Sequence, residues 1–186
     1  MAGRVEFSSG KFKELVLLFT DRSADDPLMS RVKLNKLLYY ADFEAYRRLG
    51  HAITGATYVK GEFGPMAAEL PLAEEELGRA GYLTWRIDES GSHVRKIPVA
   101  REKPDEGQFA GEELDIVAEA LFELKELGGA GARDWSHKNS AGWNLVEDEA
   151  PIPYSTAFIS TEQIPSEDID RARQLGLERN WAEIRP

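Results

Sequence analysis

One stretch, residues 30–49, constrains the fold of this 186-residue chain more than any other. Its apolar residues recur at spacings of three and four, which is the pattern of one face of an α-helix. These residues are Leu34, Leu37, Leu38, Ala41 and Ala45. Ser30 is a typical N-cap residue and Gly50 a typical stop signal, so both ends of the helix are marked. Aromatic residues widen the apolar side, and we therefore predict a central helix that other elements cover on several sides.

The rest of the chain predicts shorter elements around this helix. Periodicity and alternation predict helices over 11–20, 66–79 and 112–127, a short helix over 130–138, a strand or loop over 53–63, and a β-hairpin made of 82–87 and 94–99. Pro65 is expected to open the 66–79 helix, because a proline at the first helical position loses no hydrogen bond. The fold class is therefore α+β, mainly helical, with a small antiparallel β-hairpin or sheet.

The organisation is that of one domain with an appended tail. We place the domain at residues 10–165, with an irregular segment from 140, and a C-terminal helical tail at 166–186. Trp181 in this tail is expected to anchor either on the domain or on a partner.

Composition narrows the class of protein. Hydrophobic residues make up 42% and charged residues 30% of the chain, which is the range of a globular domain. Cysteine is absent, which excludes disulfides and cysteine zinc sites. No stretch has the apolar length of a signal peptide or a membrane span. We therefore expect a cytoplasmic protein that has no contact with a membrane.

The net charge of −10 is concentrated in residues 101–186, which carry 19 acidic and 9 basic side chains. Such a surface repels phosphate groups, which argues against nucleic acid as a partner, and it suits a basic protein. Acidic charge that serves solubility alone is the alternative explanation.

The chain lacks the motifs of the common enzyme classes. It has no phosphate-binding loop, dinucleotide fingerprint, zinc-protease motif or serine-hydrolase elbow. Its three histidines, which lie far apart without metal-ligand spacing, are His51, His93 and His137. We therefore predict no catalytic residues, no cofactor and no metal site.

His137 has the one setting that resembles a catalytic cluster, because Asp134, Ser136 and Tyr154 are near it in sequence. A nucleophile and its base must lie within hydrogen-bond distance of each other. A histidine that ties the following loop is the more common case, and we favour that structural role.

Two sets of side chains on the 30–49 helix have alternative interpretations. Lys33 and Lys36 with Arg47 and Arg48 would form a basic strip for an acidic partner or phosphate, although a solvated helix face is the more common explanation. The aromatic set would stack on single-stranded nucleic acid or belong to the core, and we favour the core. This set is Tyr39, Tyr40, Phe43 and Tyr46.

Three motifs together resemble one known family. Residues 33–40, KLNKLLYY, resemble the K-L-x-K-L-L-Y-Y motif of the Panacea domain, which is found in SocA-like antitoxins and phage-associated proteins. Phe63-Gly64-Pro65 resembles the aromatic-Gly-Pro turn of that family. Ser136-His137, Trp143 and the segment 151–154 resemble its C-terminal block. The resemblance covers about residues 10–160.

The resemblance implies a compact, largely helical domain with a small sheet. It also implies an antitoxin of a toxin–antitoxin system that neutralises a toxin encoded nearby by direct protein binding. Some members are adaptors that deliver the toxin to a protease, so a protease is a second expected partner. The residues that carry the resemblance are expected to be a mixture of scaffold and interface: Lys33, Lys36, Tyr39, Tyr40, Phe63, Gly64, Pro65, His137 and Trp143.

An alternative function is DNA binding by a winged-helix regulator. A helix followed by a two-stranded wing has this architecture, and the predicted hairpin carries Arg86, Arg95 and Lys96. The net charge of −10 argues against this function.

Overall fold

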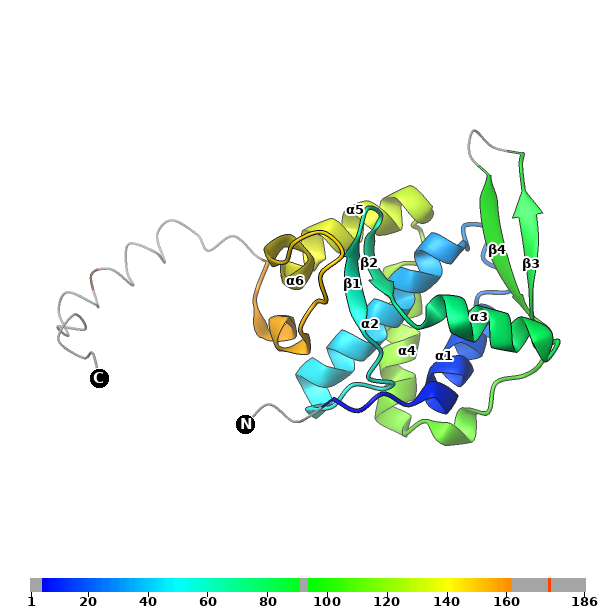
Figure 1. Cartoon of the computed structure of the whole chain (residues 1–186), viewed down its shortest axis with the longest axis horizontal. Coiled ribbons are helices and arrows are strands. Elements are labelled where there is room, and N and C mark those ends of the chain that lie inside the picture. The colour runs from blue at the N-terminus through cyan, green and yellow to red at the C-terminus, as the bar shows by residue number, and fades with distance from the viewer. Residues whose placement is uncertain (1–4, 91–93, 162–173, 175–186) are drawn as a thin grey trace.

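The structure of the chain is a computed structural model, which describes residues 5–90, 94–161 and 174 (Figure 1). In chain order the described elements are α1 (Ser9–Arg22), α2 (Arg31–Leu49), β1 (Tyr58–Gly61), β2 (Gly64–Ala67), α3 (Leu70–Arg79), β3 (Leu83–Asp88), β4 (Arg95–Ala100), the 3₁₀ helix η1 (Glu106–Gln108), α4 (Gly111–Glu123), α5 (Gly129–Asn139), α6 (Ala141–Leu145) and the 3₁₀ helix η2 (Tyr154–Phe158). Helices dominate, and β1–β2 and β3–β4 form two antiparallel hairpins. The predicted α+β class is confirmed.

The helix α2 is the centre of the domain, as its sequence predicts. The Ser30 hydroxyl accepts a hydrogen bond from the Lys33 amide at 3.2 Å, and Gly50 ends the helix with φ 79°. The apolar stripe from Leu34 to Ala45 is fully buried. Helices α1, α4 and α5, strands β2 and β4, and η2 all contact α2, which runs through the middle of Figure 1. One helix therefore organises both hairpins and the other long helices.

The hairpin of β3 and β4 is confirmed, whereas the predicted start of the third helix at Pro65 is wrong. Pro65 lies in β2 and pairs with Lys60 of β1, and α3 begins only at Leu70. The reason is tertiary: the Asn35 side chain accepts the Ala67 amide at 3.0 Å, and the Lys36 ammonium donates to the Pro65 carbonyl at 2.8 Å. These bonds from α2 hold residues 64–67 extended against the local preference for a helix start.

The remaining predictions for the chain differ in outcome. The 11–20, 112–127 and 130–138 helices are confirmed as α1, α4 and α5, with bounds shifted by a few residues. The irregular segment from 140 contains the short helices α6 and η2. Of the predicted helical tail at 166–186 the structure describes residue 174 alone, and Trp181 lies outside the described residues, so the boundary between a 10–165 domain and this tail stays a prediction.

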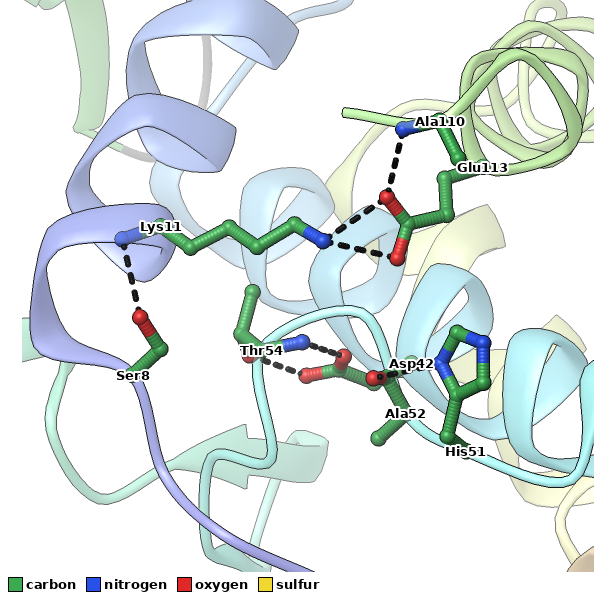
Figure 2. A network of polar contacts seen from close by, with 8 residues as sticks. All are labelled: Ser8, Lys11, Asp42, His51, Ala52, Thr54, Ala110 and Glu113. Carbon is green, nitrogen blue, oxygen red and sulfur yellow. Dashed lines mark hydrogen bonds and ion pairs between the residues drawn. The ribbon is translucent and has the colours of Figure 1, made fainter. Parts of the chain in front are cut away.

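Two polar contacts join distant parts of the fold (Figure 2). Lys11 of α1 contacts both carboxylate oxygens of the buried Glu113 at 2.7 Å, and Glu113 also accepts the Ala110 amide at the start of α4. Asp42 of α2 is fully buried and accepts hydrogen bonds from the Thr54 amide at 2.7 Å and the Thr54 hydroxyl at 2.5 Å. The two contacts connect α1 to α4 and α2 to the segment that leads into β1.

Asp42 is buried away from water, so its carboxyl group depends on hydrogen-bond partners within the core. Tyr58 donates a third hydrogen bond to it at 2.9 Å. Burial raises the pKa of Asp42, and the hydrogen bonds from Thr54 and Tyr58 oppose that rise. A buried polar group is tolerated only when its partners are present, so this network fixes the position of β1 against α2.

Replacing Asp42 with asparagine should therefore lower the free energy of unfolding by about 1–2 kcal/mol, because the new amide nitrogen does not accept the hydroxyl hydrogen bonds. Urea denaturation at pH 7 measures this change. Asp115→Asn on the exposed face of α4 is the matched control, with an expected change within about 0.5 kcal/mol. Equal effects of the two substitutions would contradict a structural role for the Asp42 network.

Candidate functional site

The turn between β1 and β2 is the place where the three sequence motifs meet. We call residues 61–64 the clamped turn, because side chains from α2, α5 and α6 contact it or the residue that follows it. Lys36 comes from α2, Ser136 from α5 and Trp143 from α6. Segments that are about a hundred residues apart in sequence thus meet around one four-residue turn.

Lys36 reaches the turn from α2 and is fully buried, with 0% of its side chain exposed. Its ammonium donates to the Pro65 carbonyl at 2.8 Å. Among the described residues no carboxylate forms an ion pair with it. Burial without an opposite charge lowers the pKa of Lys36 to about 7. The lysine therefore holds the backbone of the turn at a cost in desolvation.

Both interpretations of the α2 cations, a basic strip and a solvated helix face, are wrong for Lys33 and Lys36, whereas Arg47 and Arg48 are exposed. Lys33 is as buried as Lys36, and its ammonium contacts Asp26 at 2.7 Å and the Lys125 carbonyl at 3.2 Å. Arg47 and Arg48, at the exposed end of the helix, form ion pairs with Glu44. The lysines flank the apolar stripe, and their long aliphatic stems are covered by neighbouring elements, so the four cations do not form one surface.

Gly64 closes the turn in a conformation and a space that exclude a side chain. Its φ is +92°, which L residues rarely adopt. A Cβ atom at Gly64 would lie 2.4 Å from the Ser136 hydroxyl oxygen and 2.9 Å from the Lys36 Cε atom. The helix α5 therefore touches the turn directly, and glycine is the residue that permits this approach.

Trp143 holds the other side of the turn. Its indole nitrogen donates to the Gly61 carbonyl at 3.1 Å. The indole ring stacks on the His137 imidazole, with 3.8 Å between ring centroids, and the Lys60 ammonium lies 4.8 Å from the Trp143 ring centroid. His137 and Trp143, which the sequence singled out, are thus stacked on each other, and Trp143 contacts the hairpin.

The side chains near His137 do not assemble into a catalytic cluster. The Ser136 hydroxyl donates to the Arg133 carbonyl at 2.7 Å, and Asp134 forms an ion pair with Arg133. The Tyr154 hydroxyl donates to the Ala56 carbonyl at 2.7 Å. Burial, together with the charges of Lys36 and Arg133, lowers the pKa of His137. In the described part of the chain, no group of three or more acidic or histidine side chains is arranged to hold a metal.

The aromatic residues of α2 divide between core and surface. Tyr39, Phe43 and Tyr46 are buried, as predicted, and the Tyr39 hydroxyl lies 2.6 Å from the Ser140 hydroxyl. Tyr40 is half-buried and packs on Trp135 at 5.7 Å between centroids. Tyr40 and Trp135 line a groove of about 680 Å³ between α2, α5 and η2. The aromatic set is therefore mainly core and not a continuous stacking platform.

The cations of the predicted wing are largely engaged within the fold. Arg95 donates to the Asp88 carboxylate and, at 2.7 Å, to the Pro27 carbonyl. The Lys96 ammonium lies 4.2 Å from the Trp85 ring centroid. Arg86 is exposed. Two of the three cations that motivated DNA binding thus have intramolecular contacts.

What the clamped turn presents to solvent is its tip. Glu62 and Phe63 are exposed, and 46% of the Phe63 side chain is accessible. Sequence reasoning identified Phe63, Gly64 and Pro65 from the motif but missed Ser140 and Asp42. Lone polar residues of this kind carry no periodic signal, because their roles depend on partners from other elements.

The fold and the clamped turn define a mainly helical α+β domain that carries a fixed and exposed hairpin tip. The family model of the antitoxin SocA-like, Panacea domain matches residues 34–144, more than half of the chain. The chain therefore belongs to this family, and the match spans every residue of the clamp from Lys36 to Trp143. A search of curated proteins found no match. None of the helices among the described residues is long and apolar enough to cross a membrane.

Proposed function

We propose that this chain is an antitoxin that neutralises a toxin encoded beside it by binding the toxin protein directly in the cytoplasm, without catalysis. The family supports an antitoxin with a toxin partner. The observation that carries the direct-binding part is the exposed Phe63 on a turn whose backbone is held from both sides. A pre-organised aromatic side chain loses little conformational entropy when a partner covers it.

The partners of the polar groups near His137 in sequence support a binding role over a catalytic one. Catalysis by that histidine needs Ser136, Asp134 or Tyr154 within reach of its ring, and each of these groups is bonded elsewhere. Neutralisation then depends on the stability of a complex and not on turnover.

The test is coexpression of the tagged chain with the product of the adjacent gene. We expect that product to stop growth when it is expressed alone, and to co-purify with this chain in a fixed ratio when growth is restored. A harmless neighbour that does not co-purify would overturn the proposal. In that case salt-dependent binding to operator-length DNA would be the next measurement, since it tests the regulator alternative.

Delivery of the toxin to a protease is a further step that direct binding permits. The lifetime of the toxin in growing cells distinguishes the two modes of neutralisation. A toxin that persists in the complex indicates occlusion, whereas a toxin that disappears only when this chain is present indicates an adaptor.

A further inference from the structure

We propose that the toxin binds to one particular surface, the tip face, and that the complementary surface of the toxin is a cationic rim around an apolar pocket. The tip face consists of residues 62–63 of the clamped turn and residues 145–149 after α6. This inference rests on the proposed function and specifies its site and the chemistry of its partner.

The two segments of the tip face lie side by side. The Glu149 amide donates to the Lys60 carbonyl at 2.9 Å, and the Lys60 amide donates to the Ala150 carbonyl at 3.0 Å. The Lys60 ammonium donates to the Val146 carbonyl at 3.0 Å. Residues 149–152 therefore pair antiparallel with residues 58–60 of β1, and the Lys60 side chain ties residue 146 to the same strand next to the turn.

Apolar side chains at the tip face are exposed although the backbone beneath them is fixed. Phe63 is 46% exposed and Leu145, the last residue of α6, is 65% exposed. The turn that carries Phe63 is held through the carbonyls of Gly61 and Pro65. Exposed apolar residues on a rigid frame are typical anchors of protein interfaces, where they fill pockets of the partner.

The charge of the tip face is one-sided. Residues 58–64 and 145–150 contain the carboxylates of Glu62, Glu147, Asp148 and Glu149, against the single cation Lys60. Lys60 is already engaged by the Trp143 ring and lies 3.6 Å from Asp148. Apart from the Lys60–Asp148 pair, these two segments contain no cation that balances their carboxylates. Charge complementarity therefore selects a basic protein surface as the partner.

The burial of Lys36 beneath the turn destabilises the fold, and this local cost also points to the tip face as a binding site. Lys36 is buried without an ion-pair partner among the described residues, which disfavours folding, and what it gains is one bond to the Pro65 carbonyl. A local cost of this kind at a surface turn is typical of a functional site. The geometry of the tip is the feature that this bond preserves.

Another exposed aromatic residue provides a matched comparison. Phe122 on α4 is 76% exposed, more than Phe63, and acidic residues flank it as well. It protrudes from a regular helix and has no clamp around it. Exposure alone would therefore assign binding to Phe122, whereas the tip-face proposal assigns it to Phe63.

The experiment measures binding of the purified product of the adjacent gene to the full chain and its variants. Phe63→Ala should weaken the equilibrium affinity by at least about 30-fold, the effect of a hot-spot residue, while Phe122→Ala should change it less than about 3-fold. Glu62→Lys with Glu147→Lys should slow association by about 10-fold and reduce its salt dependence. Glu123→Lys with Glu126→Lys is the matched charge reversal, at the end of α4 and just after it, and should change association much less.

Thermal unfolding of each variant separates loss of binding from loss of folding, and we expect unchanged midpoints because all the replaced side chains are exposed. If the wild-type chain binds the neighbour but the tip variants bind equally well, the tip face is overturned and the antitoxin function stands. If the α4 variants lose binding and the tip variants do not, the interface lies on α4. If the wild-type chain binds nothing, the proposed function and this inference both fail.

Discussion

Gly64→Ala is expected to lower the free energy of unfolding by about 2–5 kcal/mol, a large share of the about 5–15 kcal/mol that stabilises a typical domain. Two effects add. A residue with a side chain at a left-handed φ costs about 1–2 kcal/mol, and forcing a methyl group into a filled space costs about 1–3 kcal/mol more. Gly64 has φ +92°, and the Ser136 oxygen lies 2.4 Å from the position of the new Cβ atom.

Gly81→Ala is the matched control for this prediction. Gly81 has φ +78° and no atom within 4 Å of its Cβ position, so this substitution tests the backbone effect without the clash. We expect a loss of about 1 kcal/mol in urea denaturation. If the two substitutions cost the same, the contact between α5 and the turn contributes nothing, and the clamp does not act as described.

The second large effect is a rise in stability between pH 7 and pH 9. Burial lowers the pKa of Lys36 to about 7, whereas an unfolded lysine titrates near 10.4. Between these values the unfolded chain binds more protons than the folded chain, so the free energy of unfolding increases with pH. Below pH 7 both states are protonated, and the full cost of the buried charge is present.

We expect a gain of about 1–3 kcal/mol over this window, measured by urea denaturation at a series of pH values. Lys36→Met removes the titrating group while keeping an unbranched side chain, and its stability should be nearly flat from pH 7 to pH 9. A wild-type curve that is equally flat would show that the Lys36 ammonium is stabilised by more than the Pro65 carbonyl.

Other titrating groups act mainly outside this window. Burial raises the pKa of Tyr39 to about 12, so ionisation of the unfolded tyrosine opposes folding only near pH 10 and above. The pKa of His137 is lowered, so the unfolded histidine takes up a proton before the folded one. This lowers the free energy of unfolding only as the pH falls toward and below the ordinary histidine value of about 6.5. Burial raises the pKa of Asp42, so its contribution opposes that of Lys36 in direction, because stability is lost as the pH rises above the ordinary aspartate value.

The parts of the fold that the sequence predicted well have local causes. The helix α2 carries its own cap at Ser30, its own stop at Gly50 and a periodic apolar stripe between them. The β3–β4 hairpin likewise follows from alternation on both sides of a turn. Each of these signals lies within the element that it predicts, so distant parts of the chain did not alter the result.

The errors arose where distant contacts overrode local preferences. Pro65 favours a helix start locally, but α2 pairs with the backbone of residues 64–67 and holds it in a strand. Lys33 and Lys36 look like surface residues by type, yet α2 is covered on several sides and leaves them no exposed face. The contact between Gly64 and Ser136 joins positions 72 apart in sequence, and neither residue signals it.

The clamp grips backbone atoms and leaves the side chains at the tip free. Lys36 and Trp143 donate hydrogen bonds to the carbonyls of Pro65 and Gly61. Gly64 has no side chain, which allows Ser136 and Lys36 to pack directly against its backbone. Residues 62 and 63 can therefore change identity without altering the bonds that fix the turn. Residues 145–149 likewise lie beyond the 34–144 span of the family match. We therefore expect substitutions at residues 62 and 63 to change what the tip binds while leaving the folding stability unchanged.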